Sequence, residues 1–152
     1  MSGGSEPPPA ASRQFVDTNV LVYAVDLTAG AKRAVAASLL EGLWSSRAGC
    51  VSVQVLQEFY VAVTRKTRPL LVDSEGGAVT AQYACWRTHR PGPEDVLAAI
   101  DIHHRHRVSL WDAMIIRSAA QLGCAVLWSE DLSDGTTYDG VLVRNPFLPS
   151  NG

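Results

Sequence analysis

The sequence predicts an α/β domain in which helices cover both faces of a parallel β-sheet. Short apolar runs rich in β-forming residues alternate with longer segments whose apolar residues recur at helical spacing. The chain has 152 residues, of which 47% are hydrophobic and 18% are charged. This length and composition suit one domain with one sizeable core.

The first third of the chain predicts the order strand, helix, helix, strand. Gln14–Val16 form a short β-rich run, and residues 18–25 continue with apolar side chains at roughly helical spacing. Residues 31–46 repeat leucine and valine at the same spacing, with charged residues between them. Residues 49–52 are a second short strand candidate.

The middle of the chain predicts helices separated by proline. Residues 53–67 carry apolar residues on one helical face, and Pro69 lies just beyond them. Asp73 or Ser74 can cap a further helix, which we expect to run to about Arg87.

A Pro-Gly-Pro break at 91–93 precedes the next predicted helix. This helix covers residues 94–106 and carries Val96, Leu97 and Ile100 on one side.

The last third of the chain predicts one helix and two strands. Ser109 is a favourable N-cap for a helix over 110–122, and Gly123 suits its C-terminal end. Residues 125–128 read as a buried strand, and residues 141–143 as a final short strand.

We expect one folded domain over residues 13–150, preceded by a flexible Gly/Ser/Pro-rich tail over residues 1–12. No apolar run reaches the roughly 20 residues of a membrane span, and the N-terminus lacks the apolar core of a secretory signal. Three cysteines lie far apart and form no C-x-x-C pair, which argues against a disulfide scaffold and against a zinc knuckle. These features predict a cytoplasmic protein without membrane association.

Four acidic residues occupy positions where a charge calls for an explanation. Asp17 directly follows a predicted strand and Asp131 lies in the loop after another, at the sheet edge where α/β proteins bind ligands. Asp112 lies in the first turn of a predicted helix, on its apolar face, and Glu58 lies within a helix. Each has an ordinary alternative: capping would explain Asp17 and Asp112, and solvation would explain the other two.

Convergence of these carboxylates at one edge would create a site for a cation. Two carboxylates about 4 Å apart repel by roughly 4 kcal/mol at an effective dielectric constant of about 20. Protons or a divalent cation must offset that repulsion, and an all-oxygen cluster suits Mg²⁺ or Mn²⁺ rather than zinc. Such a cation can activate water for attack on a phosphodiester. Glu130 and Asp134 are rivals of Asp131 for the position in this cluster.

At these residues the sequence resembles the PIN-domain ribonucleases. Four segments match the acidic motifs of that family in order, and the downstream Asp139-Gly140 and Asn145-Pro146-Phe147 resemble the tail of its VapC toxin subgroup. The four segments are Phe15-Val16-Asp17-Thr18-Asn19-Val20-Leu21, Gln57-Glu58-Phe59, Leu110-Trp111-Asp112-Ala113-Met114-Ile115 and Trp128-Ser129-Glu130-Asp131-Leu132. The resemblance spans residues 14–147.

The resemblance implies a three-layer α/β/α sandwich around a central parallel sheet. It implies a magnesium- or manganese-dependent endoribonuclease that cuts single-stranded or loop RNA, and a toxin of a toxin–antitoxin pair. It also implies a homodimer, and inhibition by a cognate antitoxin whose tail enters the active-site groove.

The resemblance also assigns roles to residues. It implies an acidic pocket with four members: Asp17, Glu58, Asp112 and Asp131. Asp17 and Asp112 are its expected direct metal ligands, and Glu58 is expected to orient metal or water. The candidate supporting polar residues are Thr18, Asn19 and Ser129, and the candidate RNA-backbone contacts are Arg65, Lys66 and Arg68.

The reaction predicted on this basis is hydrolysis that leaves a 5′-phosphate and a 3′-hydroxyl. One alternative is another magnesium-dependent phosphoesterase or phosphotransferase, which would want a second Asp where Asn19 stands. A second alternative is a non-catalytic module that binds a metal or a partner. Of the four tryptophans, Trp111 is the one candidate for stacking on a base, because it adjoins Asp112, whereas the others suit a core.

Overall fold

The computed structural model describes residues 12–149, so the tail expected over residues 1–12 lies outside the described part except for Ser12. The described chain forms a mixed sheet flanked by helices. Its strands are β1 (Gln14–Val16), β2 (Gly49–Ser52), β3 (Arg87–His89), β4 (Val126–Trp128), β5 (Thr137–Tyr138) and β6 (Val141–Arg144). Its helices are α1 (Thr18–Val25), α2 (Ala31–Ser46), α3 (Val53–Thr64), α4 (Asp73–Tyr83), α5 (Pro93–His106) and α6 (Leu110–Gln121).

The sheet has the strand order β3-β2-β1-β4-β6-β5. Neighbouring strands run parallel except β5, which pairs with β6 in the antiparallel sense. The predicted α/β fold with a central parallel sheet is therefore confirmed, with one antiparallel strand added at the edge. β1 lies at the centre, where the strand order reverses, and such a switch point is the usual place for a ligand in an open α/β sheet.

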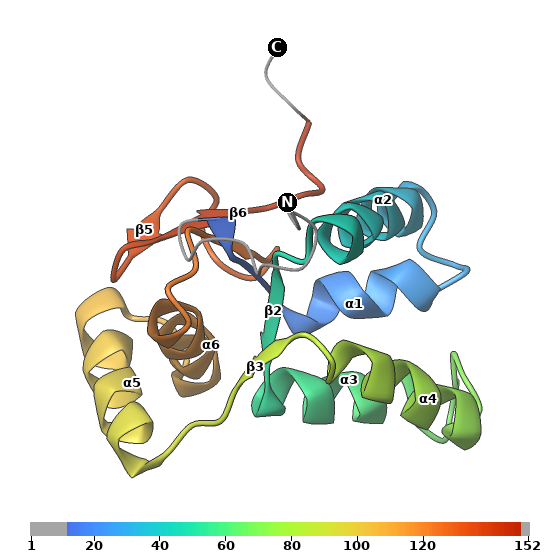
Figure 1. Cartoon of the computed structure of the whole chain (residues 1–152), viewed down its shortest axis with the longest axis horizontal. Coiled ribbons are helices and arrows are strands. Elements are labelled where there is room, and N and C mark those ends of the chain that lie inside the picture. The colour runs from blue at the N-terminus through green and yellow to red at the C-terminus, as the bar shows by residue number, and fades with distance from the viewer. Residues whose placement is uncertain (1–11, 150–152) are drawn as a thin grey trace, which may run out of the picture.

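Helices lie on both sides of this sheet (Figure 1). α5 and α6 pack against each other on one side, whereas α1, α2, α3 and α4 lie on the other. The core between the layers contains fully buried side chains from the central strands and from the helices that face them. The largest of these include Phe15, Leu21, Phe59, Ile115, Ile116 and Leu127.

Serine caps fix where two helices begin. The hydroxyl of Ser52 accepts from the backbone N–H of Val55 at 3.3 Å and starts α3 directly after β2. The hydroxyl of Ser109 accepts from the backbone N–H of Asp112 at 3.0 Å and starts α6, as the sequence predicts. Gly123 follows α6 with a φ of +68°, in the region that glycine adopts most readily.

The expected helix from Asp73 to about Arg87 is wrong at both ends. Asp73 is the first helical residue and Val72 is the N-cap, so neither Asp73 nor Ser74 caps the helix. The helix ends at Tyr83, and Arg87 belongs to β3. The β3 strand is only three residues long and two of its residues are charged or titratable, so it lacks the apolar pattern by which a buried strand is predicted.

An aromatic cluster explains why the chain leaves the helix there. The ring of Trp86 lies 5.0 Å from those of Trp44 and Tyr83, and burial of this indole draws the chain toward β2. A Cβ at Gly49 would lie 2.7 Å from the ring of Trp86, so the indole packs directly on backbone that only glycine leaves open.

Two further expectations need correction. α3 ends at Thr64 rather than at residue 67, because the chain turns back and the N–H groups of Leu70 and Leu71 donate to the carbonyl of Val63 at 2.9 and 3.0 Å. β5 was not expected, since a two-residue strand has no detectable periodicity.

The apolar side of α5 faces outward. Val96, Leu97 and Ile100 are exposed, whereas Ala99 and Ile102 are buried toward α6. No helix within residues 12–149 is long and apolar enough to cross a membrane.

The contact between Gly49 and Trp86 yields a stability prediction. We expect Gly49→Ala to lower the free energy of unfolding by about 1–3 kcal/mol, because the added methyl group must displace a packed indole. Gly77→Ala is the matched control, since nothing lies within 4 Å of a Cβ at that exposed position in α4 and the change can stabilise the helix by up to about 1 kcal/mol. Equal denaturant midpoints for the two variants would contradict the packing argument.

Candidate active site

Asp17 marks the end of the central strand and carries a buried carboxylate. Its backbone N–H donates to the carbonyl of Trp128 at 2.9 Å, which continues the pairing of β1 with β4 by one residue. Its side chain is only 5% exposed and caps α1, accepting from the N–H of Thr18 at 2.7 Å and from the hydroxyl of Ser129 at 2.7 Å. Asp17 therefore does cap α1, as the ordinary alternative predicts. The cap does not use all the hydrogen-bond acceptor sites of the carboxylate, so the residue can also bind a ligand.

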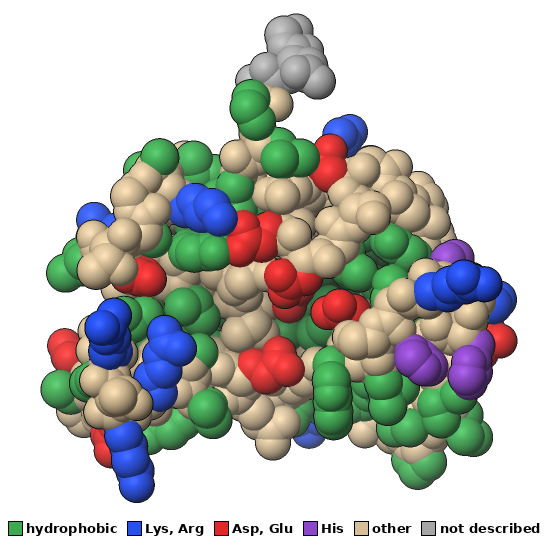
Figure 2. All heavy atoms as spheres, turned by 180° about the vertical axis from the view of Figure 1, so that it is seen from behind, with side chains coloured by type: hydrophobic (Ala, Val, Ile, Leu, Met, Phe, Trp, Pro, Cys, Tyr) green, Lys and Arg blue, Asp and Glu red, His purple; other side chains and the backbone are tan. Residues whose placement is uncertain are grey.

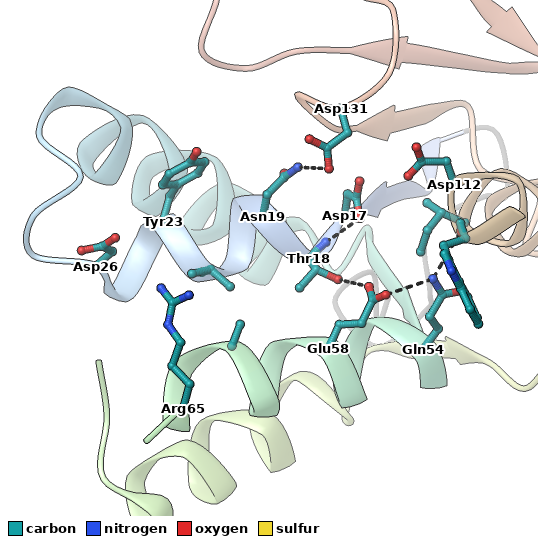
Figure 3. Close-up of a pocket in the computed structure, with 14 residues that line it drawn as sticks. Asp17, Thr18, Asn19, Tyr23, Asp26, Gln54, Glu58, Arg65, Asp112 and Asp131 are labelled. Carbon is teal, nitrogen blue, oxygen red and sulfur yellow. Dashed lines mark hydrogen bonds between the residues drawn. The ribbon is translucent and has the colours of Figure 1, made fainter. Parts of the chain in front are cut away.

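Two more carboxylates meet Asp17 from distant parts of the chain. Asp17, Asp112 and Asp131 each place one oxygen so that all three oxygens lie within 4.8 Å of one another. Asp112 comes from the first turn of α6, and Asp131 comes from the loop after β4. Figure 3 shows the three side chains around a common space. Parallel pairing of β1 and β4 is what brings residues more than one hundred positions apart to the same edge.

Glu58 completes the acidic wall from α3, across the cavity. Its carboxylate accepts from the hydroxyl of Thr18 at 2.8 Å and from the side-chain amide of Gln54 at 3.3 Å (Figure 3). The side chain is exposed, so its charge remains in contact with water. Glu58 and the three aspartates line one cavity of about 470 Å³.

Burial and mutual repulsion weaken the acidity of this cluster. Burial raises the pKa of Asp17 to about 7, although the hydrogen bonds from Ser129 and Thr18 oppose the rise, and the charges of Asp131 and Asp112 add to it. Partial burial also raises the pKa of Asp112, against the hydrogen bond from Ser109, and the nearby charges of Asp131 and Glu58 contribute. Without a counter-ion, Asp17 is therefore only partly ionised near neutral pH.

The donor set fits a hard divalent cation. The cavity lining contains carboxylate, amide and hydroxyl oxygens but no cysteine or histidine among the described residues. Asp17, Asp112 and Asp131 are close enough for one cation to reach all three, and charge on a cation would offset both the burial and the repulsion that raise the pKa of Asp17. Mg²⁺ and Mn²⁺ match this chemistry, whereas zinc would favour nitrogen and sulfur ligands.

The loop after β4 distinguishes Asp131 from its rivals. Glu130 does not line the cavity, and its carboxylate accepts a hydrogen bond from Tyr23 and pairs with Lys32 at 2.8 Å. These contacts lower the pKa of Glu130 even though burial acts in the opposite direction. Asp134 accepts from the backbone N–H of Asn145 at 2.8 Å and lines a different cavity. Of these three carboxylates, Asp131 alone lines the acidic cavity.

The expected supporting residues all contact the cluster. Thr18 bonds to Asp17 and Glu58, and the amide of Asn19 donates to Asp131 at 2.9 Å. The hydroxyl of Ser129 donates to Asp17 and accepts from the backbone N–H of Asp131 at 3.1 Å.

Of the three residues expected to contact the RNA backbone, one lines the cavity and two do not. Arg65, the residue after α3, lines the cavity, whereas Lys66 and Arg68 are exposed and do not line it. Seven further residues line the cavity without belonging to the expected site: Val22, Tyr23, Asp26, Gln54, Ala62, Trp111 and Ile115. The sequence context of Gln54 carries no signal, and the only signal for Trp111 is its neighbour Asp112.

Comparison with known proteins gives a family and several structural relatives. A family model described as PIN domain matches residues 15–133. Among curated protein sequences, none matches the chain.

Solved structures share the fold at low sequence identity. A chain of a toxin–antitoxin complex from Klebsiella pneumoniae is 19% identical, with a TM-score of 0.64 over 88% of this chain and 98% of that chain. The VapC20 toxin of Mycobacterium tuberculosis, which cleaves the sarcin–ricin loop, is 19% identical, with a TM-score of 0.57 over 75% and 86%. A VapBC2 chain from Rickettsia felis, in a structure bound to a promoter DNA fragment, is 13% identical, with a TM-score of 0.61 over 87% and 97%.

The raised pKa of Asp17 predicts how stability depends on pH. A carboxyl whose pKa is raised from 3.8 to about 7 in the folded state stabilises the fold below pH 4 and loses that contribution as the pH rises through 7. The shift corresponds to about 4 kcal/mol, and Asp112 acts in the same direction.

We therefore expect the melting temperature in chelator to fall between pH 5 and pH 8, relative to Asp17→Asn, whose side chain does not ionise. Scanning calorimetry at several pH values measures this difference. Parallel pH profiles for wild type and variant would contradict the assigned pKa.

Proposed function

The chain belongs to the PIN domain family, and on that premise we propose that it is a magnesium- or manganese-dependent endoribonuclease that hydrolyses RNA phosphodiester bonds. One observation carries the proposal: three carboxylates from three separate segments lie within 4.8 Å of one another at the switch point of the sheet. A capping or surface role would not require three acids to share this space, because their repulsion is unfavourable.

Each acidic residue has a distinct proposed role. Asp17 and Asp112 hold the cation, and Asp131, fixed by Asn19 and Ser129, completes its ligand set. The bound cation would supply Lewis-acid activation of water and neutralise charge on the phosphate.

Glu58 is proposed to orient the attacking water. Its two carboxylate oxygens are held by Thr18 and Gln54, so its position is fixed, while its exposure leaves it open to solvent and substrate. Arg65 extends from the end of α3 toward the cavity (Figure 3), where its guanidinium can bind a neighbouring phosphate.

Asn19 argues against a phosphotransferase that works through an aspartyl intermediate. Such an enzyme would use a second carboxyl two residues after Asp17, and here that position is an amide that donates to Asp131. The neutral amide supports the geometry of a carboxylate ligand rather than acting as an acid.

The protein is further proposed to be the toxin of a toxin–antitoxin pair, since the similar solved structures include toxins in complex with antitoxins. A cognate antitoxin would occupy the acidic groove and block RNA. A homodimer is also proposed, supported by large apolar side chains exposed on the outer faces of α3 and α5. These side chains are Val53, Tyr60 and Val61 on α3, and Val96, Leu97 and Ile100 on α5.

Loss of a cation ligand tests the proposed activity. We expect Asp112→Asn to lower magnesium-dependent RNA cleavage by about 100-fold or more, because the substitution removes a charge that the cation requires. Cleavage of labelled RNA with Mg²⁺ and with chelator provides the measurement, and end analysis should find 5′-phosphate and 3′-hydroxyl products. Asp134→Asn, a change of the same type outside the cavity, is the control and should retain activity. Undiminished cleavage by Asp112→Asn, or a 2′,3′-cyclic phosphate product, would overturn the mechanism.

Two adjacent acids provide a second, internally matched test. Asp131→Asn should reduce cleavage, because Asp131 belongs to the acidic cluster. Glu130→Gln should keep the reaction and lower the melting temperature only modestly, since it weakens the hydrogen bond with Tyr23 and a solvent-screened pair with Lys32. The comparison requires initial rates for both variants and their denaturation curves. The opposite pattern would transfer the catalytic role to Glu130.

A further inference from the structure

We propose that Trp111 is the platform on which one base of the RNA substrate stacks, beside the phosphate to be cleaved. This inference rests on the proposed nuclease function and deepens it, because it names the residue that selects an unstacked nucleotide.

The indole of Trp111 is exposed although tryptophan usually buries most of its surface. Its exposed fraction is 67%, whereas Trp86 is buried at 8%. Trp44 and Trp86 contact each other, and the indole N–H of Trp128 donates to Gln14 at 2.7 Å. Among residues 12–149, the indole of Trp111 makes no ring contact and no hydrogen bond, and its hydrogen bond with Gln54 is made by the backbone carbonyl. A large exposed aromatic ring beside a polar cavity is a frequent mark of a binding site.

The backbone of Trp111 is tied to the acidic wall. The amide nitrogen of Gln54 lies 3.3 Å from the carbonyl oxygen of Trp111 and 3.3 Å from a carboxylate oxygen of Glu58. Trp111 also directly precedes the proposed cation ligand Asp112, in the same first turn of α6. The backbone of Trp111 is therefore held close to the carboxylates, while its indole stays largely exposed.

The charges along the cavity suit a nucleic-acid strand. Gln54 and Arg65 lie at opposite ends of the cavity along α3 (Figure 3), about 16 Å apart at 1.5 Å per residue. Trp111 lies at the Gln54 end, and Arg65 lies at the other end together with Asp26. The remaining carboxylates of the cavity lie between these ends. Figure 2 shows acidic side chains across the middle of this face, with several Lys and Arg side chains to their left. A strand laid along this groove places a phosphate at Arg65, the scissile phosphate at the acidic cluster and a base on the indole.

Base stacking can supply binding free energy that the negatively charged side chains of the cavity do not. Carboxylates repel the RNA backbone, and base–aromatic stacking contributes about 1–3 kcal/mol per base whatever the base. A base paired within a helix cannot offer its face to the indole, so the platform selects single-stranded or loop nucleotides.

A protein partner explains the exposed ring less well. A docking helix needs a continuous apolar groove, but the other large exposed apolar residues of the described chain lie outside this cavity, whose remaining lining is mostly polar or charged.

The test compares substitutions that keep or remove the aromatic face. We expect Trp111→Ala and Trp111→Leu to raise the KM for a labelled single-stranded RNA by about 5- to 150-fold, with a smaller change in kcat. Trp111→Phe and Trp111→Tyr should restore most of the loss, which a merely apolar contact would not require. Leu97→Ala is the control, since Leu97 is 68% exposed but lies outside the cavity. Equal melting temperatures show that the variants remain folded.

A binding experiment keeps this inference separate from the nuclease proposal. Wild type should bind oligouridylate more tightly than an abasic ribose-phosphate oligomer of equal length, and Trp111→Ala should lose that preference in fluorescence anisotropy. If wild type cleaves no RNA with Mg²⁺, the proposed function fails, and the binding preference still decides the role of the indole. Equal binding of oligouridylate by wild type and Trp111→Ala overturns the inference. It is also overturned if the alanine variant binds RNA normally but loses affinity for the antitoxin.

Discussion

The geometry of the acidic site depends on the buried carboxylate of Asp17 and on the hydrogen bonds that hold it. The residue stands at the end of the central strand, where a hydroxyl or an amide could cap α1 as well as a carboxylate does. Two hydrogen bonds do not fully compensate for its burial, and its pKa accordingly rises to about 7. A charged group that is buried without full compensation lowers stability. Such a residue at the switch point of a parallel sheet is typical of a functional site, where residues are selected for ligand binding as well as for folding.

Ser129 connects this carboxylate to the rest of the cluster. Its hydroxyl donates to the carboxylate of Asp17 and accepts from the backbone N–H of Asp131, so one side chain links the first acid to the loop that carries the second. The β1–β4 register, in which Val16 pairs with Trp128, places Ser129 beside Asp17.

The concentration of acidic residues in one cavity also changes how the net charge of −2 bears on RNA binding. A bound divalent cation would offset two of these negative charges and bring the formal net charge from −2 to 0, a balance compatible with RNA.

Much of the fold was predictable because its signals are local. The observed bounds of four elements, β1, α1, α2 and β2, match those predicted from apolar spacing. Ser109 correctly predicts the start of α6, because it is the N-cap. The short strands β3 and β5 were not predictable, since they are defined by pairing with distant strands rather than by their own residues.

The same distinction applies to the site. Asp17 and Asp112 could be predicted from their places at a strand end and in a helix turn, whereas the choice between Glu130 and Asp131 depends on Tyr23 and Lys32, which meet that loop only in three dimensions. Gln54 was invisible for a similar reason, because its contact with the backbone of Trp111 spans 57 residues.

The site divides into a buried half and an exposed half, and this division would couple the proposed cation to the proposed RNA substrate. Asp17 belongs to the buried half, where a proton and the proposed cation would compete for the same oxygen, so affinity for that cation would rise as the pH passes through 7. Glu58 and Trp111 belong to the exposed half, where water and substrate have access. An RNA phosphate brought between them adds negative charge beside the cation, and by linkage each ligand then strengthens the binding of the other. Without the cation the same carboxylates repel the phosphate, so the stacking surface alone is left to hold the strand.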